Sequence, residues 1–139
     1  MKKKTADSKR IKRPGKNRGK VKPTEDTSPS PSAEYPSVSL RYLNSSHCIS
    51  KCSKEDQVLF ANRVRLLTQM TWAQINVSHR HGLGYEKINQ LKDGLPADAG
   101  DQPALAFRFA GKKPMVGFRY GAVFYVVWFD YDFNLYDHG

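Results

Sequence analysis

The chain has 139 residues, with 23 Lys and Arg against 13 Asp and Glu, which gives a formal net charge of +10 and an isoelectric point near 9.7. This length has room for one domain, and the excess of positive charge makes a polyanion such as nucleic acid the first class of partner to consider. We find neither a secretory leader nor a run approaching the roughly 18 apolar residues of a membrane span. We therefore expect a soluble cytoplasmic protein without a membrane partner.

The first 34 residues differ in composition from the rest. Residues 2–22 contain eleven Lys and Arg against one acid, and Ile11 and Val21 are the only large apolar side chains between Met1 and Tyr35. Such a stretch cannot bury enough apolar surface to offset the entropy of ordering it, so residues 1–34 are predicted to form a disordered basic arm. The arm either keeps the protein soluble, directs nuclear import, or binds nucleic-acid phosphates through residues such as Lys12 and Arg13.

The remaining residues, 35–139, are predicted to form a single domain that begins with a strand and helices. Residues 37–43 largely alternate apolar and polar side chains, as a half-buried strand does. Ser53 is a good N-cap residue for a helix that we expect to run to about Met70. A second helical unit is predicted over residues 71–80, followed by turns at the glycines and a further short helical stretch. Cys48 and Cys52 are interpreted as reduced thiols, and we expect neither a metal nor a cofactor.

Behind a loop near residues 96–103 the pattern changes to strands. Residues 104–110 and 115–120 alternate with a period of two, and residues 122–129 form a near-continuous apolar run typical of a well-buried strand. Tight turns between them predict a C-terminal three-stranded antiparallel meander. The expected fold class is α+β, with an N-terminal strand, two or three helices and then the meander. The predicted core residues are Trp72, Phe107, Phe109, Phe124, Val126 and Trp128.

This element order, the arginines within "AFRFAGKKPMVGFRYG" and the Tyr/His end after "VVWFD" resemble the RelE/ParE/YoeB-like superfamily of small bacterial toxins over residues 37–139. Many members of that superfamily are ribosome-dependent messenger-RNA endonucleases. The resemblance implies a RelE-like fold, a toxin of a toxin-antitoxin system that acts on messenger RNA with the ribosome, and an antitoxin protein as partner. The stretch "TWAQINVSHRHGLGYEKI" also resembles an uncharacterised family of short phage- or plasmid-associated proteins.

The chemistry of such a nuclease selects the candidate catalytic residues. Attack of a ribose 2′-hydroxyl on the adjacent phosphate needs a base, cations that stabilise the phosphorane, and an acid for the leaving 5′-oxygen; it needs no metal. Arg108 and Arg119 lie on neighbouring predicted strands, and we expect their guanidinium groups to converge on one phosphate. Tyr136 and His138 stand where the superfamily often carries its C-terminal Tyr and His, and either is a candidate acid or base.

Other basic residues are candidates for nucleic-acid binding. The superfamily's catalytic lysines would have to be supplied by Lys112 and Lys113 in a turn, and Arg80 is a candidate phosphate contact. His79 and His81 lie two residues apart, so on a helix they would point in different directions, and we predict no zinc site there. We interpret the two histidines as residues that complement the negative end of a helix dipole.

A plainer interpretation of these residues stays open. Arg108 and Arg119 would then form ordinary ion pairs with Asp130 and Asp132 across the sheet, and the C-terminal segment would complete the core. Two functions follow from the two interpretations. One is a metal-independent endoribonuclease; the other is a nonenzymatic accessory protein of a mobile element that binds nucleic acid or a protein, as the ParE-like branch poisons a topoisomerase.

Overall fold

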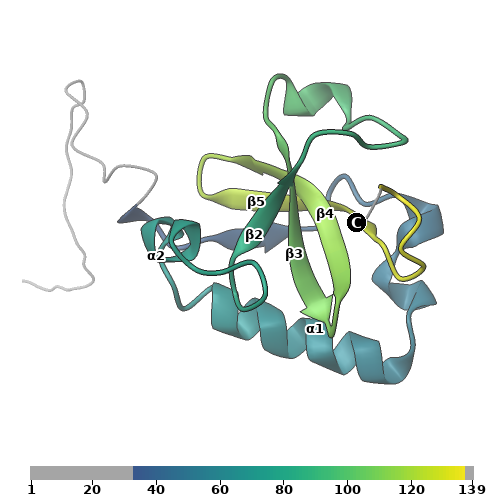
Figure 1. Ribbon diagram of the computed structural model, residues 1–139, viewed down its shortest axis with the longest axis horizontal. Coiled ribbons are helices and arrows are strands. Elements are labelled where there is room, and N and C mark those ends of the chain that lie inside the picture. The colour runs from purple at the N-terminus through teal and green to yellow at the C-terminus, as the bar shows by residue number, and fades with distance from the viewer. Residues whose placement is uncertain (1–32, 137–139) are drawn as a thin grey trace, which may run out of the picture. The chain divides into compact units, whose positions relative to one another are not determined.

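The computed structural model describes residues 33–136, in which a five-stranded mixed sheet carries two α-helices (Figure 1). Of the predicted basic arm, residues 1–32 lie outside the described part. None of the helices within residues 33–136 is long and apolar enough to cross a membrane. The elements in chain order are β1 (Ser37–Ser39), η2 (Ser45–His47), η3 (Ile49–Lys51), α1 (Lys54–Leu67), α2 (Trp72–Asn76), β2 (Tyr85–Ile88), η4 (Ala97–Ala99), β3 (Ala104–Ala110), β4 (Lys113–Tyr120) and β5 (Val123–Phe129).

The sheet has the strand order β1-β5-β4-β3-β2. β1 pairs with β5 in parallel, and the other neighbours pair antiparallel. The α+β prediction is confirmed, but the sheet is larger than the predicted three-stranded meander because β1 and β2 join its two edges. The short helix predicted after the glycines is wrong, since β2 occupies those residues. These residues form a strand because they pair with β3. Tyr85 lies opposite Phe107, and the two rings contact each other edge to face with their centroids 5.5 Å apart.

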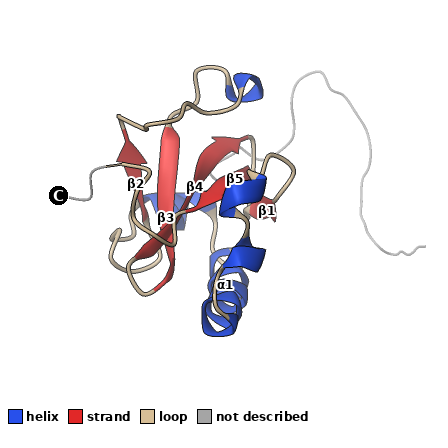
Figure 2. Cartoon of the chain, turned by 90° about the vertical axis from the view of Figure 1, so that its right-hand side faces the viewer, coloured by secondary structure: helices blue, strands red, loops and turns tan. Residues whose placement is uncertain are grey.

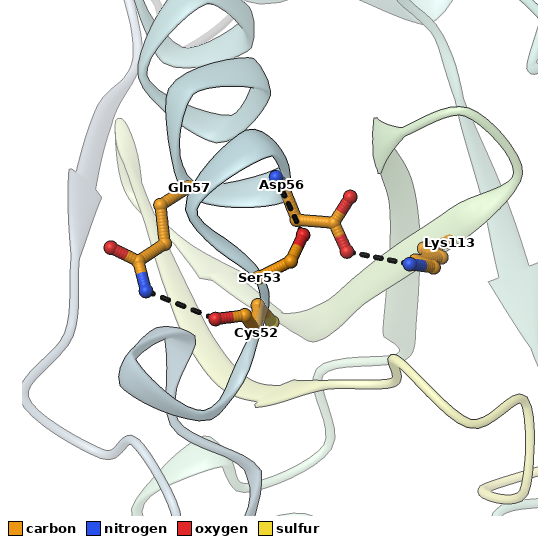
Figure 3. A network of polar contacts seen from close by, with 5 residues as sticks. All are labelled: Cys52, Ser53, Asp56, Gln57 and Lys113. Carbon is orange, nitrogen blue, oxygen red and sulfur yellow. Dashed lines mark hydrogen bonds and ion pairs between the residues drawn. The ribbon is translucent and has the colours of Figure 1, made fainter.

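Helix α1 begins where the sequence places it. The Ser53 hydroxyl accepts a hydrogen bond from the backbone N–H of Asp56 at 3.1 Å, which satisfies one of the free donors at the helix N-terminus (Figure 3). Asp56 is buried and forms an ion pair with Lys113 of β4 at 2.5 Å. The helix therefore turns the Asp56 and Leu67 side to the sheet. Val58, Leu59 and Leu66 of α1 are exposed.

Apolar side chains pack on both faces of the sheet. On the face that α1 and α2 cover, Trp72 contacts Phe107, whose ring also packs edge to face on Phe124 at 4.9 Å. Helix α1 lies below the strands in both views (Figures 1 and 2). A second cluster contains Val116, Phe118 and Trp128, with Leu135 from the C-terminal segment. The six predicted core residues are all buried, which confirms that prediction.

A β-bulge sets which side chains of β5 face which cluster. Val116 lies opposite Trp128 and Gly117 opposite Val126, so Val127 is an extra residue on β5. As a result the consecutive residues Val127 and Trp128 both belong to the second cluster, whereas Phe124, Val126 and Phe129 belong to the cluster under the helices. A similar shift between Arg108 and Ala110 occurs where β3 pairs with β4.

Candidate functional site

A cavity of about 360 Å³ lies at the β2 and β3 side of the sheet, on the face away from the helices. The 78–84 turn, β2, β3 with its turn to β4, and the C-terminal segment all contribute to its wall. Three of its lining side chains are cationic and one is a carboxylate, so the wall carries net positive charge. The lining residues are Arg80, His81, Glu86, Ala106, Arg108, Lys112, Pro114, Phe133 and Tyr136. We call this cavity the basic pocket.

The turn that carries Arg80 and His81 is held by its own backbone. The carbonyl of His79 accepts hydrogen bonds from the N–H groups of Gly82 at 2.9 Å and Gly84 at 3.0 Å. Gly84 is required sterically, because a Cβ atom there would lie 2.2 Å from the backbone oxygen of Ser78. The turn is therefore compact, and its residues Arg80 and His81 line the pocket.

Arg63 of α1 joins this turn to β3. Its guanidinium donates to the carbonyl of Gly82 at 3.0 Å and to the carbonyl of Arg108 at 2.6 Å. Burial and the neighbouring Arg108 guanidinium both lower the pKa of Arg63. One side chain thus fixes the separation of the two segments that bring Arg80 and Arg108 to the pocket.

The two histidines of the turn are stacked. Their ring centroids are 4.8 Å apart at an interplanar angle of 25°, and the His81 backbone N–H donates to Nδ1 of His79 at 3.1 Å. Partial desolvation, followed by the charges of Arg108, His79, Arg80 and Lys112, lowers the pKa of His81. The sequence predicted that both histidines lie at the C-terminus of a helix. This prediction is wrong, because α2 already ends at Asn76.

Arg80 and Glu86 form an ion pair on the pocket wall. Their Nη1 and Oε2 atoms are 2.8 Å apart, and both side chains are partly exposed at 50% and 39%. At this exposure the pair adds little stability, since water screens it. The ion pair places the Arg80 guanidinium and the Glu86 carboxylate next to each other on the cavity wall.

The C-terminal segment is anchored by Asp130, which is fully buried. Its carboxylate accepts the backbone N–H of Asn134 at 2.9 Å and that of Leu135 at 3.3 Å. This turn includes Phe133, whose φ of 58° is a backbone conformation that residues other than glycine rarely adopt. Phe133 also lines the pocket. The anchor brings Tyr136 back onto the sheet, where it is only 8% exposed.

Tyr136 is present in the pocket as a neutral phenol. Burial is the main cause that raises its pKa to about 12, and Glu86 and Asp130 add to the shift while Arg108 and Arg80 oppose it. A phenol with this pKa is a proton and hydrogen-bond donor at neutral pH rather than an acceptor of protons. Of the two predicted roles, acid or base, the raised pKa of Tyr136 disfavours the base.

The predicted convergence of Arg108 and Arg119 on one phosphate is wrong. Arg119 lies on the helix-covered face, where its guanidinium stacks 4.1 Å from the centroid of the Trp72 ring and Nε donates to the carbonyl of Gly121 at 2.8 Å. Arg108 alternates with Phe107 and therefore faces the opposite side, into the basic pocket. Residues on neighbouring strands share a face only if their register parity agrees, and here it does not.

The other predicted site residues divide into three groups. Arg80, Lys112 and Tyr136 line the basic pocket with Arg108. Lys113, which follows Lys112 directly, is bound to Asp56 on the helix side. Lys12, Arg13 and His138 lie outside residues 33–136, so their positions are not described. Five pocket residues were not assigned to a site from the sequence, namely His81, Glu86, Ala106, Pro114 and Phe133. For His81, the glycines that follow it in the sequence indicated a turn, and this was the one local sign of its position.

Comparison with known proteins gives no relative. No protein-family model matches the chain, and neither a curated protein nor a solved structure matches it significantly. Within residues 33–136, no three His, Cys, Asp or Glu side chains lie close enough together to hold a metal ion.

Proposed function

We propose that the protein is a metal-independent endoribonuclease that cleaves messenger RNA, with the ribosome presenting the substrate and an antitoxin protein as its natural inhibitor. The observation that carries the proposal is the basic pocket, in which Arg80, Arg108 and Lys112 face one cavity with a neutral Tyr136. Cations and a phenol are the groups that stabilise a phosphorane and protonate a leaving oxygen. The proposal places this activity in the cytoplasm.

The pocket suits a phosphodiester better than a small neutral ligand. Arg108 presents a planar fork that can bind two phosphate oxygens at once, and Lys112 adds a point charge from the adjacent turn. Glu86 offsets one of the three positive charges, which leaves a surplus of two. This surplus exceeds the single negative charge of a phosphodiester and suits the additional negative charge of the phosphorane. The predicted basic arm would add affinity for the rest of the nucleic acid without setting the position of cleavage.

The alternative is a nonenzymatic accessory protein that uses the same pocket to bind nucleic acid or a protein. Both functions need the cations, and cleavage additionally needs groups that transfer protons. The placement of Tyr136 in the cavity, as a buried donor beside Arg108, favours the enzyme.

Paired variants of the two strand arginines test the proposal. The full-length protein is added to ribosomes programmed with a defined message in the presence of a chelator, and we expect fragments ending in 2′,3′-cyclic phosphate. Arg108→Ala removes a donor to the phosphorane and should lower the cleavage rate about 10²- to 10³-fold. Arg119→Ala is the matched control, since it loses the stacking on Trp72, costs about 1 to 2 kcal/mol of stability and should leave the rate unchanged.

The alternative gives a different result in the same assay. An unaltered protein that binds RNA, loses that binding on Arg108→Ala and yet cleaves no message, with or without ribosomes, is the accessory protein. Equal loss of cleavage from the two variants would show that the pocket is not the site.

A further inference from the structure

The proposed reaction lacks one participant, a base for the ribose 2′-hydroxyl proton. We infer that His81 is this base, and the inference rests on the proposed function. The side chains of the basic pocket that could take a proton are His81, Glu86 and Tyr136, because its remaining polar groups are the cations Arg80, Arg108 and Lys112. The choice among these three follows from their surroundings.

Two of the three acceptors are poorly suited. Tyr136 has its pKa raised to about 12, so it holds its proton throughout the neutral range. The Glu86 carboxylate already contacts the Arg80 guanidinium through Oε2 at 2.8 Å, so a cation of the pocket wall faces that oxygen atom. His81 lies in the cavity wall without an ion pair of this kind among the described residues.

The position of the His81 ring is built by the fold. It stacks on His79, and its own backbone N–H is bound to Nδ1 of His79, so the two imidazoles form one unit within the 78–84 turn. Arg63 ties that turn to the carbonyl of Arg108, the residue that we propose to hold the phosphate. The imidazole and the phosphate-binding guanidinium are thereby fixed on opposite segments of the same cavity.

The charges around His81 favour the form that a base needs. The groups facing it are His79 and Arg80 from its own turn, Arg108 from β3, Lys112 from the β3–β4 turn, Glu86 from β2 and Tyr136 from the C-terminal segment. Partial desolvation and the surrounding cations disfavour the imidazolium, and the pKa of His81 is lowered as a result. The lowered pKa increases the fraction of neutral imidazole at pH 7, and the neutral ring is the form that accepts a proton.

The step balances in protons and bonds. The neutral His81 imidazole takes the proton of the 2′-hydroxyl while that oxygen bonds to phosphorus and the bond from phosphorus to the 5′-oxygen breaks. The leaving 5′-oxygen takes the phenolic proton of Tyr136. The products are a 2′,3′-cyclic phosphate and a 5′-hydroxyl, and the proton on His81 returns to Tyr136 through solvent.

Single-turnover cleavage on programmed ribosomes, measured against pH with the full-length chain, tests this assignment. For the unaltered protein we expect the rate to fall on acidification, with a midpoint below that of an ordinary histidine, because protonation removes the base. His81→Gln should lower the rate about 10²- to 10⁴-fold and abolish the acidic limb of the profile. Free imidazole should restore part of the rate of His81→Ala, which a purely structural role would not allow.

Binding and control variants separate the possible failures. The affinity of His81→Gln for a message carrying a 2′-deoxy nucleotide at the cleavage site should match that of the unaltered protein, since neutral imidazole carries no charge. His47→Gln changes a histidine of η2, outside the pocket lining, and should behave as the unaltered chain. Retention of the rate and the acidic limb in His81→Gln, or loss of the limb in Glu86→Gln instead, overturns the assignment while the nuclease stands. An unaltered protein that cleaves nothing overturns both.

Discussion

Gly117→Ala is expected to destabilise the protein strongly. Gly117 lies in the middle of β4, and a Cβ atom added there would lie 1.8 Å from the backbone oxygen of Tyr125 on the neighbouring strand. Both atoms belong to rigid backbone or are attached to it directly, so β4 and β5 would have to separate at the centre of the sheet. We expect a loss of about 3 kcal/mol or more, because overpacking that moves backbone exceeds the usual cost. Chemical denaturation followed by circular dichroism measures it.

Gly94→Ala is the matched control for this change. Gly94 has a negative or extended φ and no heavy atom within 4 Å of the position where its Cβ would lie. The same added methyl group should therefore change stability by no more than about 0.5 kcal/mol. A Gly117→Ala protein as stable as Gly94→Ala would show that the strands do not approach each other as closely as described, and the bulge assignment would fail with it.

The bulge opposite Gly117 also explains why the sequence predicts β5 only in part. The run "VFYVVWF" correctly indicates a buried strand, but its alternation is interrupted because Val127 is an extra residue. An unbroken alternation would put Trp128 on the same face as Phe124 and Val126, whereas the bulge places it in the second cluster. A bulge depends on the partner strand, and for this reason the local sequence contains little signal for it.

The same limit accounts for the arginines. Arg108 and Arg119 were both correctly placed on strands, and strand positions follow from local alternation. Which face each strand turns to the helices depends on register, and the register here puts Arg119 under Trp72 and Arg108 in the basic pocket. In the sequence the two arginines look equivalent, because each lies within an alternating strand pattern. Only the pairing of the strands distinguishes a structural arginine from a candidate phosphate ligand.

The pocket residues from the 78–84 turn were harder to find. His79, Arg80 and His81 fit a helix end in the sequence, yet α2 ends at Asn76 and Gly84 permits a tight turn that a Cβ atom would block. The glycines were recognised as turn residues, but their spacing says nothing about what the turn packs against. The contact between Arg63 and Arg108, 45 residues apart, sets this position, and long-range contacts of this kind are not encoded in local pattern.

Asp130→Ala is expected to release the C-terminal segment and with it part of the basic pocket. The fully buried carboxylate accepts the N–H groups of Asn134 and Leu135, and alanine leaves both donors without this acceptor. We expect a loss of about 2 to 4 kcal/mol in the free energy of unfolding, because each buried donor that loses its acceptor costs about 1 to 3 kcal/mol and the segment can partly relax into water. Backbone N–H exchange at Leu135 should accelerate more than exchange in β3.

The graded variant and the functional readout decide whether Asp130 acts through this turn. Asp130→Asn keeps one acceptor oxygen but turns an N–H₂ group toward the second donor, so its stability should lie between that of the unaltered protein and Asp130→Ala. Asp132→Asn removes a charge two residues away on an exposed side chain and should be neutral within about 0.5 kcal/mol. Under conditions where Asp130→Ala remains folded, Tyr136 should leave the pocket and RNA cleavage should fall. An Asp130→Ala protein with the stability, Leu135 exchange and cleavage rate of Asp132→Asn would show that the anchor does not position Tyr136.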